Sequence, residues 1–107
     1  MDRTPPPVRL AAALALPLTA ERRSAEVFVD GDLEVRFAPR PTDGPQVPHT
    51  RDEFYVVAAG TGYYRVEESV TAVGPGDLLF AAAHAAHGFE DISADFSVWV
   101  VFYGPAK

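Results

Sequence analysis

The apolar and polar positions of the chain change their pattern at Glu26. Before it, Val8–Leu16 is rich in alanine and leucine, which predicts a short helix that ends at Pro17. After it, short β-branched and aromatic runs are separated by glycine and proline, and no helical period recurs. Short runs at roughly ten-residue spacing predict an all-β sandwich or barrel rather than alternating strands and helices.

The runs predict about eight strands. They cover Glu26–Asp30, Leu33–Ala38, Phe54–Ala59, Tyr63–Glu68, Val70–Val73, Asp77–Ala81, His87–Glu90 and Phe96–Tyr103. The first two runs flank a glycine-containing turn and therefore predict a hairpin. Within the second run, the apolar residues are expected on one face of the strand, with Glu34 and Arg36 on the other.

Two segments outside these runs complete the organisation. Pro39–Pro48 holds four prolines and a glycine and is expected to be an ordered loop, because proline removes backbone donors and fixes φ. Residues 1–23 are expected to form a tail and a short helix packed on the barrel, and residues 24–107 one β domain.

Composition narrows the classes of partner and cofactor. The 107 residues carry 15 acidic and 9 basic side chains, and the net charge of −6 argues against nucleic acid or an anionic membrane surface as the partner. The absence of cysteine excludes disulfides, thiolate catalysis and cysteine-ligated zinc or iron–sulfur clusters. A metal ion would need imidazole and carboxylate ligands, and the chain has three histidines.

The apolar run Leu10–Leu18 has a second interpretation as part of a cleavable signal peptide, although it is short and interrupted by Pro17. No run reaches the roughly 20 apolar residues that span a bilayer. A cytoplasmic location is therefore the expectation.

His49 and Glu53 are the first candidate ligand pair. Four residues of straight strand span about 13 Å, whereas ligand atoms on one ion lie only about 3 Å apart. The chain must therefore bend at Thr50–Asp52 if both side chains are to reach one ion. Strand alternation from Glu53 would carry Tyr55 and Val57 to the interior as well.

His87 is the candidate third ligand, since three strand-length runs separate it from Glu53 and an antiparallel barrel can return it to the same place. Two imidazoles and one carboxylate suit Fe, Mn, Ni or Zn and leave positions open for water or substrate.

Plainer roles remain for the same residues. His49 could cap a loop, and His84 and His87 could be solvated. Glu53 could form a surface ion pair with Arg51 or Arg65.

The segment that contains His49 and Glu53 and the segment that contains His87 resemble the two sequence motifs of the cupin superfamily. Members of this superfamily are small double-stranded β-helix proteins. His49, three residues, Glu53, six residues and Gly60 match the second half of the first cupin motif. Gly76 and His87 keep the spacing of the second motif. The resemblance covers about Leu33–Tyr103 and implies a cupin-type jelly-roll barrel whose metal residues are His49, Glu53 and His87.

The chain departs from the family pattern at four positions. The first histidine of the first motif falls on Val47, and the proline, glycine and asparagine of the second fall on Ala82, His84 and Asp91. The change at Val47 removes one of the four ligands that cupins commonly use. Gln46 and His84 are the nearest candidates for a replacement.

The resemblance implies a metal-dependent dioxygenase, isomerase or decarboxylase of a small organic molecule. The alternative is a non-catalytic binding or sensing module with a metal-free pocket. Further pocket candidates are Gln46, Tyr55, His84 and Phe89. Phe96–Tyr103 is apolar on both faces, so one face needs cover beyond the core, and a homodimer is expected.

Overall fold

The computed structural model describes residues 4–18, 23–42, 44–46 and 48–107. These residues form one helix and nine strands. Their bounds are α1 Leu10–Leu14, β1 Ala25–Asp30, β2 Leu33–Ala38, β3 Gly44–Pro45, β4 Asp52–Ala59, β5 Gly62–Val66, β6 Ser69–Val73, β7 Leu78–Ala81, β8 His87–Glu90 and β9 Ser97–Tyr103. The expected all-β class with a short N-terminal helix is confirmed.

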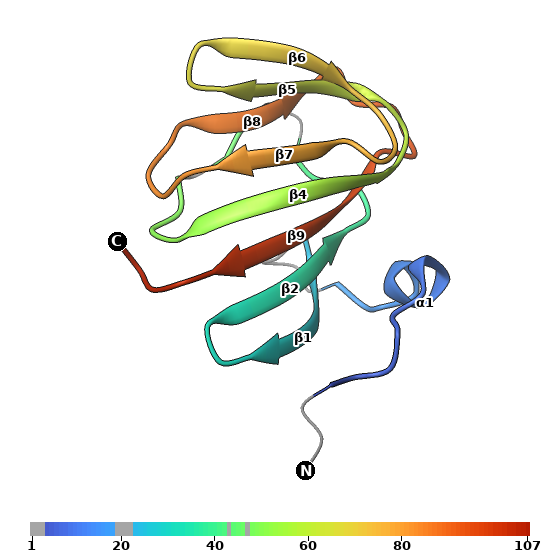
Figure 1. Ribbon diagram of the computed structural model, residues 1–107. Coiled ribbons are helices and arrows are strands. Elements are labelled where there is room, and N and C mark those ends of the chain that lie inside the picture. The colour runs from blue at the N-terminus through green and yellow to red at the C-terminus, as the bar shows by residue number, and fades with distance from the viewer. Residues whose placement is uncertain (1–3, 19–22, 43, 47) are drawn as a thin grey trace.

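The strands form two antiparallel sheets. One has five strands in the order β1-β2-β9-β4-β7 (Figure 1). The other has four in the order β3-β8-β5-β6. A single core of buried residues joins the sheets, with Val57 and Val98 contributed by the first and Tyr64 and Phe89 by the second. Glu53 on β4 and His87 on β8 lie on the facing sides of these two sheets.

The helix is shorter than the expected Val8–Leu16. It begins after Arg9, which has an extended backbone and no side-chain capping bond, and it ends before Ala15. An uncapped helix of one turn gains little from its own hydrogen bonds, and Pro17 prevents it from continuing. Within α1, Ala13 is the buried residue.

The expectation that Pro39–Pro48 is entirely loop is wrong at one point. Gly44–Pro45 forms the short strand β3, in which Gly44 pairs with Phe89 and Pro45 with Gly88. This strand lies at the edge of the four-stranded sheet, where a missing ladder donor is tolerated.

Register shows which face of the five-stranded sheet points inward. Val100 of β9 belongs to the core, and it pairs with Arg36 on one side and Tyr55 on the other. Directly paired residues lie on the same face of an antiparallel sheet. The polar face of β2, with Glu34 and Arg36, is therefore the inward one.

The outward face of this sheet carries the apolar residues of β2, together with Phe54, Phe80 and Trp99. Phe80 and Leu78 of β7 are 50% and 67% exposed. No helix among the described residues has the length and apolar character needed to cross a membrane. The cytoplasmic location and the expected domain boundaries stay predictions.

Candidate metal centre

The candidate centre begins at the first residues of β4. Thr50 and Arg51 form a bend, and the strand starts at Asp52. From there the burial alternates, so that Glu53, Tyr55 and Val57 face the interior as expected. The bend turns His49 back toward the strand, and its Nε2 lies 3.6 Å from Glu53 Oε1.

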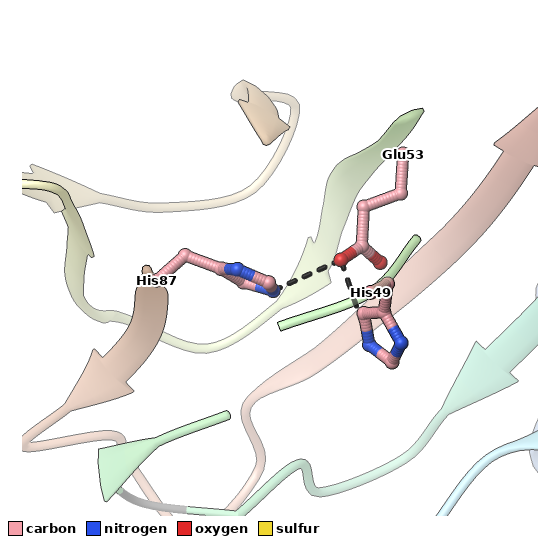
Figure 2. A group of neighbouring side chains, drawn as sticks. All are labelled: His49, Glu53 and His87. Carbon is pink, nitrogen blue, oxygen red and sulfur yellow. Dashed lines mark ion pairs between the residues drawn. The ribbon is translucent and has the colours of Figure 1, made fainter. Parts of the chain in front are cut away.

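β8 brings the second imidazole to the same carboxylate. His87 is the first residue of this strand, and its Nε2 lies 2.9 Å from Glu53 Oε1. One ligand atom each from His49, Glu53 and His87 can be chosen so that all lie within 4.8 Å of one another. Figure 2 shows the Glu53 carboxylate directed to the space between the two rings.

Hydrogen bonding fixes which nitrogen of His87 faces this space. His87 Nδ1 lies 2.9 Å from the carbonyl oxygen of Ala85, which can only accept, so Nδ1 carries the proton. A neutral His87 then presents the Nε2 lone pair to the carboxylate. A backbone carbonyl that fixes the tautomer in this way is the usual partner of a metal-ligating histidine.

The Glu53 carboxylate has an unusual environment. Glu53 is 1% exposed, and neither of its oxygens has a hydrogen-bond partner in the described part of the chain. A buried carboxylate without donors is costly, and a lone pair at 2.9 Å on His87 adds repulsion unless a cation or a proton lies between them. The donor set therefore fits a divalent ion, which would supply the missing charge.

The pKa values of His87 and Tyr55 depend on burial and on the nearby Glu53 carboxylate. Burial acts to lower the pKa of His87, but the contacts with Glu53 and the Ala85 carbonyl outweigh it and raise this pKa overall. Burial, and then the Glu53 charge, raise the pKa of Tyr55 above its ordinary value. The Tyr55 hydroxyl therefore stays protonated and donates to His87 Nε2 at 3.1 Å.

Hydrogen bonds also tie the two ligand-bearing segments together. His84 N donates to His49 O at 2.7 Å, and Ala83 N donates to Asp52 Oδ1 at 2.9 Å. Lys107 Nζ donates to the second oxygen of Asp52, and these contacts lower the Asp52 pKa, with Lys107 as the larger cause. Asp52 thus faces away from the interior and joins the start of β4 to the loop before His87.

Three of the four further pocket candidates lie together. Gln46, Tyr55 and Phe89 line a cavity of about 270 Å³ that also reaches His49 and Glu53. The fourth, His84, is not brought there: it is exposed, with a left-handed backbone at φ 69°, and its Nε2 bonds to Lys107 O. The turn in the 82–86 loop directs the ring outward, so His84 does not replace the missing ligand.

The structure decides against two of the plainer alternatives, which are a surface ion pair of Glu53 and a solvated His87. Arg51 pairs with Glu34 and Arg65 with Glu90, so neither takes Glu53. His87 is buried rather than solvated. Val47, the position of the missing family ligand, lies outside the described residues.

Sequence reasoning missed the cavity residues that precede β1 and β3. Arg23, Ser24 and Thr42 line it as well. No motif marks them, and only the doublet Arg22-Arg23 signals a local concentration of positive charge.

Comparison with known proteins identifies the family. A sequence model of the cupin domain matches residues 33–103. The chain belongs to the cupin family. A 64-residue segment of this cupin is 39% identical to an uncharacterized protein of Streptomyces coelicolor. That match covers 60% of the present chain and 61% of the relative, so less than two thirds of the relative is matched.

Solved structures agree on the cupin fold. A cupin 2 conserved barrel domain protein from Salinispora arenicola superposes with a TM-score of 0.69 at 13% identity, covering 94% of this chain and 91% of that one. KdgF from Halomonas sp. gives a TM-score of 0.66 at 24% identity, covering 77% and 79%. Identities at this level show a shared fold, and the site of this cupin is argued from its own residues.

Proposed function

We propose that this cupin holds a divalent metal ion through His49, Glu53 and His87 and binds a small organic molecule in the adjoining cavity. The observation that carries the proposal is the buried Glu53 carboxylate, which has no donor for either oxygen while His87 is neutral and which lies 2.9 Å from His87 Nε2. A metal ion satisfies both groups at once.

A bound ion would act as a Lewis acid toward an oxygen atom of the ligand. The chain's own residues would supply the rest. Tyr55 directs a hydroxyl donor at the metal side of the cavity, and Phe89 and Phe102 form apolar parts of its wall. Membership of the cupin family makes a dioxygenase, isomerase or decarboxylase of a small organic substrate the enzyme class to test.

The first test is a calorimetric titration of chelator-treated protein with Mn²⁺, Ni²⁺ and Zn²⁺. One site per chain is expected in the wild-type protein, and His87→Gln should lose it because the Nε2 donor is gone. His84→Gln is the matched control, since His84 is exposed and lies outside the cluster. Equal binding by wild-type protein and His87→Gln would contradict the proposed site.

The second candidate is a non-catalytic cupin that binds its ligand in the same cavity without metal. It is favoured by Val47, which replaces a usual family ligand with a side chain that cannot coordinate. Small molecules that raise the unfolding temperature equally with and without chelator would support this alternative. Metal-dependent binding followed by turnover in the presence of oxygen would support the enzyme.

We further propose that the outward face of the five-stranded sheet pairs two copies of the chain. Phe54, Phe80 and Trp99 share this face, and Phe80 is 50% exposed. Sedimentation should show a dimer at micromolar concentration that Phe80→Glu dissociates. Val70→Glu is the control, because Val70 is 44% exposed but belongs to the other sheet. A wild-type monomer would contradict this pairing.

A further inference from the structure

The cavity beside the metal centre has two polar ends that lie at different levels of the barrel. Along β9, Phe102 pairs with Glu53, whereas Val98 pairs with Ala38 at the far end of β2. Four residues of strand separate these levels by about 13 Å. Glu53 marks the near level, and Arg23 and Ser24, which precede β1, line the cavity toward the far one.

Apolar side chains form much of the wall between the two ends, with Thr42, Gln46 and Tyr55 as its polar members. Val98, Val100 and Phe102 line one side, and Phe89 lies opposite them on β8. The cavity volume of about 270 Å³ is below the 300–1,000 Å³ of pockets that hold drug-sized ligands. A molecule that fills this space is therefore small and has an apolar body.

Arg23 is held at the far end by a specific set of contacts. The side chain of Arg36 is buried, and it donates to both the carbonyl oxygen and the hydroxyl of Ser24, at 2.7 and 2.8 Å. These bonds anchor the backbone next to Arg23. The Arg23 guanidinium itself donates to the carbonyl oxygen of Arg40 at 2.8 Å.

Arg36 and Arg23 differ in whether a carboxylate neutralises their charge. Arg36 is neutralised by Glu34 at 3.0 Å, and Glu34 also pairs with Arg51. No carboxylate of the described residues forms an ion pair with Arg23. With a divalent ion on one carboxylate and two neutral imidazoles, the near end carries one net positive charge, and Arg23 adds another at the far end.

We infer that the ligand is a small organic anion with two oxygen-bearing ends and an apolar body. One end lies at the metal centre, and the other, a carboxylate, accepts hydrogen bonds from Arg23. The inference rests on the proposed function for the near end and on Arg23 alone for the far end. A cavity positive at both ends, in a chain of net charge −6, selects such an anion over neutral molecules of the same size.

The test uses adipate and hexanoate, two acids of the same chain length of which only adipate has a second carboxylate. Protein loaded with the divalent ion that it retains is titrated with each acid at low ionic strength. Adipate is expected to bind about two- to fivefold more tightly, because an exposed guanidinium gives a modest but measurable gain. Arg23→Gln should remove this preference, and Arg23→Lys should keep part of it.

Arg40→Gln is the matched control. It removes the same charge from a neighbouring exposed residue that does not line the cavity, and it leaves the backbone carbonyl that holds Arg23. Equal affinity for the two acids, no binding of either, or a preference that survives Arg23→Gln would overturn the inference while metal binding stands. A protein that takes up no metal would overturn the proposed function itself, so the two failures are distinguishable.

Discussion

Replacing Glu53 by glutamine should stabilise the metal-free protein and abolish its response to metal. Glu53→Gln keeps the volume of the side chain and removes a charge that is 1% exposed and has no donor in the described chain. The glutamine amide can donate to the Nε2 lone pair of His87, which it would share with the Tyr55 hydroxyl and which lies 2.9 Å from the present carboxylate oxygen. The substitution therefore converts a repulsive contact into a hydrogen bond.

The magnitude follows from the cost of a buried polar group without a partner, about 1–3 kcal/mol. Relief of this cost should raise the free energy of unfolding by about 1–3 kcal/mol. In thermal unfolding this corresponds to a midpoint that is higher by roughly 4–12 °C for a domain of this size. The gain should be measured at increasing pH up to about 9 and should grow as His87 loses its proton, because the contacts with Glu53 and the Ala85 carbonyl raise the pKa of His87 above the ordinary value of about 6.5.

The assay is urea unfolding of chelator-treated protein, followed by the fluorescence of the single tryptophan, Trp99. Metal at about 100 times its dissociation constant should stabilise the wild-type protein by roughly 2.7 kcal/mol and leave Glu53→Gln unchanged. Glu90→Gln is the control, because Glu90 belongs to an exposed pair with Arg65. A metal-free Glu53→Gln protein less stable than wild type by more than about 1 kcal/mol would refute the reasoning, because it would mean that the carboxylate is well satisfied.

Three further predictions concern the surroundings of the site. The raised pKa of His87 implies that its contact with Glu53 stabilises the metal-free protein fully below about pH 6.5 and less as pH rises through the folded pKa. Unfolding midpoints measured from about pH 5 to 9 should show this decline, and a flat profile would contradict it. Asp52→Ala should weaken metal binding about tenfold in a calorimetric titration, because the loop before His87 loses its hydrogen bond to Asp52. Asp77→Ala removes a backbone contact at Gly74 instead and should leave metal binding unchanged. Equal effects of the two aspartate variants would exclude a positioning role. Gly60→Ala should cost about 2–4 kcal/mol in urea unfolding, because the backbone has φ +80° and a Cβ would lie 2.6 Å from Phe96 Cα, whereas Gly76→Ala, at φ +90° with open space, should cost only about 1–2 kcal/mol. Equal losses would argue against the close approach at Gly60.

The strand pattern and the bend between His49 and Glu53 followed from local signals in the sequence. Periodicity identified β2 and β8 with the bounds that the structure shows, because alternation and flanking turns are local properties. The need for a bend between His49 and Glu53 followed from strand rise alone. Proximity of His87 depended on the order of strands in the barrel, which the family spacing supplied.

The orientation of β2 could not be found in the same way. Alternation separates Glu34 and Arg36 from their apolar neighbours, but it does not say which face is inward. Pairing with Val100 of β9 decides it, and that contact lies far away in the sequence. The usual assumption that polar residues face solvent fails here because Arg36 is satisfied by Ser24 and Glu34 inside the fold.

Arg23 was missed for a related reason. It lies outside every strand, and its place at the cavity depends on hydrogen bonds that Arg36 makes with Ser24. Such long-range anchoring leaves no periodic signal. The residues at the far end of the cavity could therefore be identified only from the packing of the two sheets.

The metal content of the purified protein tests the central claim most directly. Wild-type protein and Glu53→Gln should be prepared side by side without a metal-affinity column and analysed for Fe, Mn, Ni, Zn and Cu. The wild-type chain is expected to carry close to one equivalent of a divalent metal, and the variant close to none. Wild-type protein that is metal-free and also refuses each added ion would contradict the account.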